Sequence, residues 1–100
     1  MAVFLKIHQA YREVIAVCDA ELIGKKFEEG KVQLDVSEAF FGGDRMDGKY
    51  AERIIKDRLA EDACFNFVGK EAVQIGINAG AIDKDCVMKV QGVPYALLLV

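Results

Sequence analysis

The sequence predicts a single α+β domain with about five strands in a mixed or antiparallel sheet and two main helices packed on it. Three observations indicate this class. The 100 residues, 53% of them hydrophobic, suffice for one core and not for two. Strand-like segments lie toward both ends of the chain, and two segments with helical periodicity lie between them. Residues 1–100 are therefore interpreted as one domain.

The first two strands are expected at residues 2–8 and 13–18, which are rich in valine, isoleucine and phenylalanine. The polar residues 9–12 between them predict a hairpin. The second strand shows no polar alternation, which indicates that both its faces are covered and that it lies inside the sheet. Asp19 is then expected to cap a short helix at residues 20–23.

A third strand is expected at residues 31–36, where aliphatic and polar side chains alternate. In this strand Leu34 would face the core and Gln33 would face solvent. Residues 37–43 end in two consecutive glycines, which favour a loop or a single helical turn over a continued strand.

Two helices are expected, at residues 49–62 and at residues 70–79, because their apolar side chains recur at a helical period. Asp47 is the expected N-cap of the first helix. Arg58 falls inside the apolar arc of that helix, which predicts either a stem lying along apolar surface or an ion pair with Asp62.

The last two strands are expected at residues 86–91 and 94–100, joined by a tight turn at Gly92 and Val93. The apolar run from Leu97 to Val100 indicates an interior position for the end of the last strand.

Composition excludes several classes of protein. Thirteen basic and sixteen acidic side chains give a formal charge of −3, so general attraction to phosphates is absent and no DNA partner is expected. No apolar run approaches the roughly 20 residues of a membrane-spanning helix, and the N-terminal segment lacks the pattern of a secretion signal. The spacing of Cys18, Cys64 and Cys86 fits neither a disulfide framework nor a paired zinc knuckle, which favours a reducing, cytoplasmic location.

Four blocks of the sequence resemble an archaeal family known as domain of unknown function 424. The blocks comprise Phe4 to His8 with parts of Val14 to Gly30, then Leu34 to Gly42, Asn66 to Val73, and Gly92 to Tyr95. Together they span nearly the whole chain. The resemblance implies an archaeal cytoplasmic protein of α+β architecture, and it implies no activity, cofactor or catalytic residue. Through that setting it associates the chain with translation or other RNA-related machinery.

Residues 43–49 match the spacing of a phosphate-binding loop, because two glycines are followed by Lys49 between a predicted strand and a predicted helix. Such a loop needs a small hydroxyl after the lysine to bind magnesium, and Tyr50 stands there. Asp44 and Asp47 would also bring negative charge close to the phosphates. We favour an ordinary loop that ends in a helix N-cap and expect no nucleotide cofactor; nucleotide binding is the alternative.

His8 and Cys18 could in principle serve as metal ligands or as a catalytic base and nucleophile. In the expected hairpin they lie about 16 Å apart along the strands, at roughly 3.3 Å per residue, which is too far for either role. Cys64 and Cys86 could approach each other, but a buried free cysteine usually acts as a small hydrophobic residue. We therefore expect no metal site and no cofactor.

Two glycine-bounded segments are the candidates for partner binding. The first comprises Lys25, Lys26, Phe27, Glu28 and Glu29, and the second comprises Phe41, Gly42 and Gly43. Both place aromatic or charged side chains where core formation does not require them, and such loops commonly bind partners. About two of the three rings of Phe27, Phe40 and Phe41 are expected in the core, and an exposed ring would mark a contact surface. For the charged residues the alternative is a solvated charge run.

Lys49, Arg53 and Lys56 share one side of the first main helix and could contact RNA phosphates. Pairing within the helix, of Glu52 with Lys56 and of Arg53 with Asp57, explains the same pattern without a ligand, and we favour it.

The sequence therefore favours a small binding module that docks on an RNA or protein assembly, with RNA, a ribonucleoprotein or a protein as the partner. The alternative is a small enzyme that uses loop carboxylates such as Glu28 and Glu29 as general acid and base. Binding is favoured because catalysis needs functional groups that converge, and the sequence shows none that do.

Overall fold

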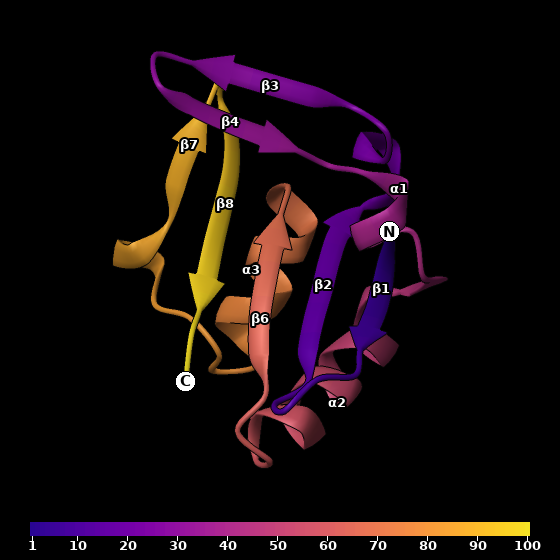
Figure 1. The fold of residues 1–100 in the computed structure, drawn as a ribbon. Coiled ribbons are helices and arrows are strands. Elements are labelled where there is room, and N and C mark those ends of the chain that lie inside the picture. Colours follow the sequence, from indigo (N-terminus) through magenta and orange to yellow (C-terminus); the bar gives the residue numbers. More distant parts are fainter.

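The computed structural model describes residues 1–100 and contains two sheets (Figure 1). Six strands form a sheet in the order β5-β1-β2-β6-β8-β7, and β3 and β4 form a separate two-stranded hairpin. The predicted α+β class and the mixed sheet are confirmed. The expected number of strands, about five, is too low, because β3, β5 and β6 have weak sequence signals.

The large sheet contains β1 (Ala2–His8), β2 (Val14–Asp19), β5 (Asp44–Asp47), β6 (Cys64–Val68), β7 (Met88–Val90) and β8 (Val93–Leu98). The hairpin contains β3 (Lys26–Glu29) and β4 (Val32–Asp35). The helices are α1 (Glu38–Phe41), α2 (Gly48–Leu59) and α3 (Lys70–Asn78), with short 3-10 turns η1 (Ala20–Leu22) and η2 (Lys84–Cys86). No helix is long and apolar enough to cross a membrane.

The parallel pair of β2 and β6 lies at the centre of the large sheet. Ile15 lies opposite Phe65 and Val17 opposite Phe67, whereas every other neighbouring pair in this sheet is antiparallel. β2 is buried along almost its whole length, which confirms its predicted central position. The strand β6 was not expected from the sequence, and it supplies the second half of this central pair.

Helices α2 and α3 cover one face of the large sheet and lie behind it in Figure 1. The core between the layers contains Ile15, Ile55, Phe65 and Phe67 among its fully buried side chains. A Cβ atom at Gly76 would lie 2.9 Å from Cζ of Phe67, so glycine allows α3 to approach the sheet closely. Both predicted main helices are confirmed.

The other face of the sheet is covered at one end only. The hairpin β3–β4 and helix α1 pack across the carboxyl ends of β2 and β6 and enclose a second apolar cluster (Figure 1). The backbone N–H of Gln91, in the β7–β8 turn, donates a 2.7 Å hydrogen bond to the carboxylate of Glu29. This bond ties the tip of the hairpin to the far end of the sheet. Fully or nearly fully buried members of the cluster are Ala16, Cys18, Val36, Phe41 and Val68.

Several local expectations require correction. The end of β8 is not interior, because Leu97 and the two residues after Leu98 are exposed. The final turn comprises Gln91 and Gly92, with φ of 50° and 79°, because Val90 already pairs with Val93. These positive φ values suit a two-residue turn whose twist matches the strands it connects.

The ion pairs of α2 also differ in part from expectation. Arg58 pairs with Glu13 at 3.0 Å and not with Asp62, because the β1–β2 hairpin reaches the end of the helix. Glu52 and Lys56 pair at 3.2 Å as predicted. The expected N-cap is confirmed, since the carboxylate of Asp47 accepts a hydrogen bond from the backbone N–H of Lys49.

Candidate functional site

The structure brings the two predicted partner-binding segments together. Residues 24–36 fold back as a hairpin, in which the N–H of Val36 donates to the carbonyl of Lys25 at 2.9 Å. Phe27 and Phe41 consequently meet in the same apolar cluster. The charged residues of the first segment are exposed, although the carboxylate of Glu29 also accepts the hydrogen bond from Gln91; they are Lys25, Lys26, Glu28 and Glu29.

The second segment serves packing. Phe41 is only 4% exposed, so its ring is not available to a partner, and we correct the expectation that it lies in a contact surface. A Cβ atom at Gly43 would lie 2.6 Å from the Cα of Lys6, and at Gly42 it would meet the backbone of Glu38. The two glycines therefore let the chain pass tightly between α1 and β1. Phe27 and Phe40 are half-buried at the border of the cluster.

The string from Gly43 to Lys49 does not form a loop. Its residues Asp44–Asp47 are β5, which pairs with β1 at the edge of the large sheet. A phosphate-binding loop curls its backbone N–H groups around the ligand, whereas the N–H groups of an extended strand point alternately to opposite sides. The prediction of an ordinary loop at these residues was wrong. The extended backbone also lacks the geometry of a phosphate-binding loop, which was the alternative.

His8 and Cys18 lie apart, as predicted, although the register differs by one residue. His8 pairs with Val14, and Cys18 pairs with Phe4, so His8 and Cys18 are offset by four positions along β1. The imidazole of His8 stacks on Phe40, with ring centroids 4.6 Å apart, and its Nε2 lies 2.8 Å from the carbonyl oxygen of Phe40. His8 thus fixes α1 against the sheet.

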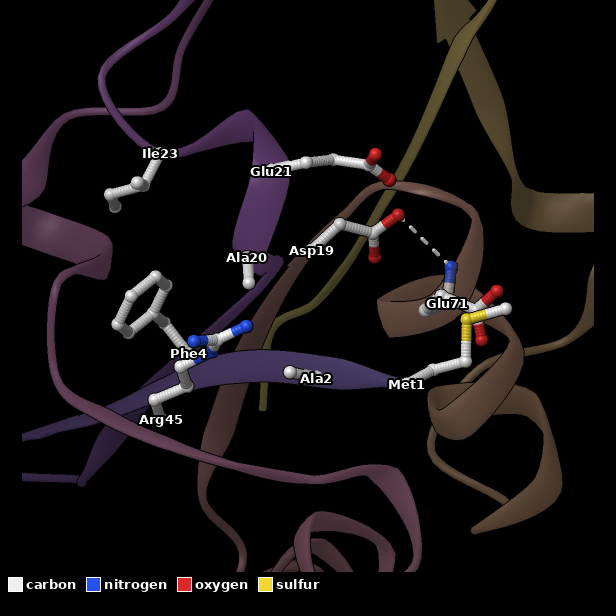
Figure 2. Close-up of a pocket in the computed structure, with 9 residues that line it drawn as sticks. All are labelled: Met1, Ala2, Phe4, Asp19, Ala20, Glu21, Ile23, Arg45 and Glu71. Carbon is white, nitrogen blue, oxygen red and sulfur yellow. Dashed lines mark hydrogen bonds between the residues drawn. The ribbon is translucent and has the colours of Figure 1, made fainter.

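A pocket of about 440 Å³ lies beside the carboxyl end of β2 (Figure 2). Its apolar part includes Phe4 and Ile23, and its charged part includes Arg45 and Glu21. Figure 2 shows Asp19 at the back of this pocket, directed toward the N-terminus of α3. The remaining lining residues are Met1, Ala2, Ala20 and Glu71.

Asp19 is the one buried charged residue of the chain, and its carboxylate caps α3. It accepts hydrogen bonds from the N–H of Glu71 at 3.2 Å and from that of Ala72 at 2.8 Å. A Cβ atom at Gly69 would lie 2.6 Å from the carboxylate oxygens of Asp19, so only glycine fits there. Asp19 was expected to cap the short helix that follows it, but its side chain makes no bond to η1.

Burial raises the pKa of Asp19 above its usual value, and the charges of Glu71 and Glu21 act in the same direction. The hydrogen bonds from Ala72 and Glu71 oppose that shift. Burial, with the charge of Asp19, also raises the pKa of the Cys18 thiol to about 12, although a backbone hydrogen bond with Phe4 lowers it. Cys18 is therefore a thiol at neutral pH and is not a nucleophile.

The buried polar group of the pocket, Asp19, stabilises the fold. Both carboxylate oxygens of Asp19 accept hydrogen bonds from the N-terminus of α3. The carboxylate thereby occupies the position at the helix end where an anion would bind. Glu28 and Glu29, proposed from the sequence as acid and base, do not line this pocket. The arrangement explains how β2, the β6–α3 turn and α3 are held together.

A second feature is the part of the sheet face that the hairpin and α1 do not cover. Alternation along the strands places Val14 of β2 and Asn66 of β6 on this face, on the same side as the second cluster, and both are only half-buried. The ammonium of Lys6 is bound to the carbonyl of Ala39 at 2.7 Å. We call this surface the open half-face; it comprises Val14, Cys64 and Asn66, and Lys6 and His8 border it beside α1.

Sequence reasoning missed the open half-face, because it depends on which strands lie side by side. Val14 and Cys64 are 50 positions apart and come into register only through the parallel pairing of β2 with β6, which also places Asn66 on the same face. A signal was present in the apolar character of β2 on both of its faces, which predicted a cover over each face.

The comparisons with known proteins agree with this fold. The sequence profile of a family described as "Protein of unknown function (DUF424)" matches residues 7–100. The chain is also similar to a crystal structure of an uncharacterized conserved protein from Methanopyrus kandleri, with a TM-score of 0.88 and 27% sequence identity. That match covers 98% of this chain and 90% of the other. A search of the curated proteins found no significant match.

Proposed function

Because the chain belongs to the DUF424 family, described only as proteins of unknown function, we propose its role from its own surface: it is a binding module that docks a protein partner on the open half-face. One observation carries the proposal. On this face the pair of β2 and β6 is only partly covered at its amino-terminal end, where Val14, Cys64 and Asn66 are half-buried and lie outside the second cluster. Sheets of parallel strands are normally covered on both faces, so a partner is expected to complete the cover of this pair.

The charge of the surface favours a protein over RNA. The open half-face carries no charged side chain, and the ammonium of Lys6 at its border is bound to the carbonyl of Ala39. The half-buried Val14 and Cys64 give it an apolar centre, as in protein interfaces. RNA binding would need basic residues that gather, whereas the stripe on α2 is partly neutralised by the pair of Glu52 with Lys56.

The outer face of the hairpin is a second part of the proposed surface, in line with the charged candidates of the first segment. Lys26 and Glu28 are exposed there, opposite Asp35 and Gln33. Balanced charges of this kind form the polar rim of an interface. Glu29 lies on the same strand, and Lys25 directly precedes it.

We place this module in the cytoplasm, and its three free cysteines support a reducing location. The resemblance to an archaeal cytoplasmic family makes a protein component of a translation assembly one class of partner, by association.

The experiment compares three lysine substitutions in a tagged protein used for capture from native lysate. Asn66→Lys changes the open half-face, Gln33→Lys changes the hairpin, and Gln74→Lys makes the same chemical change on the exposed side of α3. We expect Asn66→Lys to lose the partner and Gln74→Lys to retain it, with all three folded by circular dichroism. Capture unchanged in Asn66→Lys and Gln33→Lys, or capture of RNA that weakens steeply with salt, would overturn the proposal.

A further inference from the structure

Exposed apolar side chains gather at one corner of the molecule. Eight large hydrophobic residues are exposed, and four of them lie at the start of β7 and around the end of β8, away from the turn that joins the two strands. We call this region the β7–β8 corner. The exposed fractions are 48% for Met88, 46% for Leu97, 75% for Leu99 and 54% for Val100. Single exposed apolar residues are common on protein surfaces, but a group of this size marks a site of contact.

The outer edge of β8 is unpaired at the same corner. β7 pairs only with the first half of β8, from Val93 to Tyr95, and the chain before β7 turns away as η2. The N–H of Gly69 donates to the carbonyl of Pro94, so the even-numbered residues of β8 direct their backbone groups toward β6. The N–H and C=O of Leu97 therefore point outward, where no strand receives them.

We propose that this edge pairs with the same edge of a second copy of the chain. The two β8 strands run antiparallel around a two-fold axis at Leu98, so that Leu97 of each copy lies opposite Leu99 of the other. In this register both residues direct N–H and C=O across the axis, and the two large sheets become one continuous sheet. The apolar side chains at the corner are then covered by their copies.

Self-complementarity is the reason for choosing a second copy as the occupant. The segment from Ala96 to Val100 contains no charged residue, so antiparallel pairing with itself places no like charges opposite each other. An edge that meets only water is normally protected by lysine, proline or a bulge, and this segment has none of these. The interface is isologous and closes after two copies.

The dimer would also place the two open half-faces side by side, because a two-fold axis perpendicular to the sheet keeps equivalent faces on one side. The dimer does not depend on the protein partner proposed above. Loss of dimerisation with capture retained, or the reverse, separates the two proposals.

Sedimentation equilibrium of the purified chain tests the proposal. We expect a mass twice the 11.0 kDa of the chain. Leu97→Pro removes the outward N–H, which has no strand partner in the monomer, together with the exposed Leu97 side chain, and should give an 11.0 kDa species with an unchanged circular dichroism spectrum. Should that variant misfold, Leu97→Lys, which places a charge at the axis, decides the question and should also be monomeric.

Val32→Lys is the matched control, because Val32 is also 46% exposed but lies on the hairpin, and it should dimerise like the wild type. A wild-type chain that stays monomeric up to about millimolar concentration would overturn the proposal. Dimers that persist in folded Leu97→Lys would overturn it as well. Either result would assign the exposed corner another role.

Discussion

At the scale of single residues, Asp19 connects three parts of the fold through one carboxylate. It ends β2, packs against Gly69 after β6, and caps α3 through the N–H groups of Glu71 and Ala72. The helix dipole favours a negative charge at this position. Burial disfavours the charged form, so burial and the helix end shift the pKa of Asp19 in opposite directions.

Asp19→Ala should destabilise the protein by about 1–3 kcal/mol, because two buried N–H groups lose their acceptor. Glu21→Ala is the control, since Glu21 lies on the same pocket but is exposed and makes no hydrogen bond to α3. Urea unfolding of both variants measures the effect. Equal unfolding midpoints for the two variants would show that the cap contributes nothing.

The raised pKa of Asp19 gives a second prediction, on pH dependence. The folded protein holds this proton to higher pH than the unfolded chain does, whose aspartate pKa is about 3.9. The stability from the proton is fully present below that value and is lost as pH rises through the folded pKa. The wild-type free energy of unfolding should therefore fall relative to that of Asp19→Asn as pH rises from about 4. A difference that stays flat or grows would contradict the assignment.

The three cysteines should differ in reactivity in the order of their exposure. Cys18 is fully buried with a pKa of about 12, Cys64 is half-buried, and Cys86 is exposed. Labelling of the native protein with iodoacetamide, followed by mass spectrometry, should modify Cys86 first and Cys18 only after unfolding. Rapid labelling of native Cys18 would show that the second apolar cluster opens readily.

At the scale of elements, the hairpin β3–β4 is held by one apolar face. Phe27 and Leu34 lie opposite each other and pack on the second cluster, whereas Gln33 lies on the outer face. Leu34→Asp should destabilise the protein by about 1–3 kcal/mol, because it places an unpaired charge against apolar side chains. Gln33→Asp should change stability by less than about 0.5 kcal/mol. Similar melting temperatures for the two variants would exclude the predicted facing of β4.

The same elements show what a sequence can predict. β1, β2 and β8 were found from their apolar, β-branched and aromatic residues, β4 from its alternation, and both main helices from their helical period. β5 has the sequence Asp-Arg-Met-Asp, which shows no strand pattern, so it was not predicted. This polar edge strand forms because β1 is present to pair with it. β6 has only five residues and an asparagine at its centre, so its strand character comes from the neighbours β2 and β8.

The candidate sites were less predictable than the fold, because they depend on distant pairs. Asp19 and its partner Ala72 are 53 positions apart, and local sequence offered the nearer η1 as the helix to cap. Phe41 resembled a loop anchor in the sequence, but α1 turns its ring into the second cluster. In both cases the partner of a side chain was decided by tertiary packing.

At the scale of the whole molecule, the two faces of the sheet are covered unequally. Helices α2 and α3 protect one face of β2 and β6, while the hairpin and α1 protect only the carboxyl ends on the other. The centre of the sheet is therefore its most stable part. The hairpin is a two-stranded sheet that relies on docking.

Hydrogen exchange should follow this inequality. The amides of residues 15–18 in β2 and 65–68 in β6 lie in the innermost strands and should exchange only through global unfolding. The amides of β3 and β4 should exchange at least about tenfold faster, because undocking the hairpin leaves the large sheet intact and needs less free energy. Exchange at low denaturant, read by NMR, measures both groups. If the hairpin amides were protected as strongly as those of β2, the second cluster would fold and unfold as one unit with the helix-covered core.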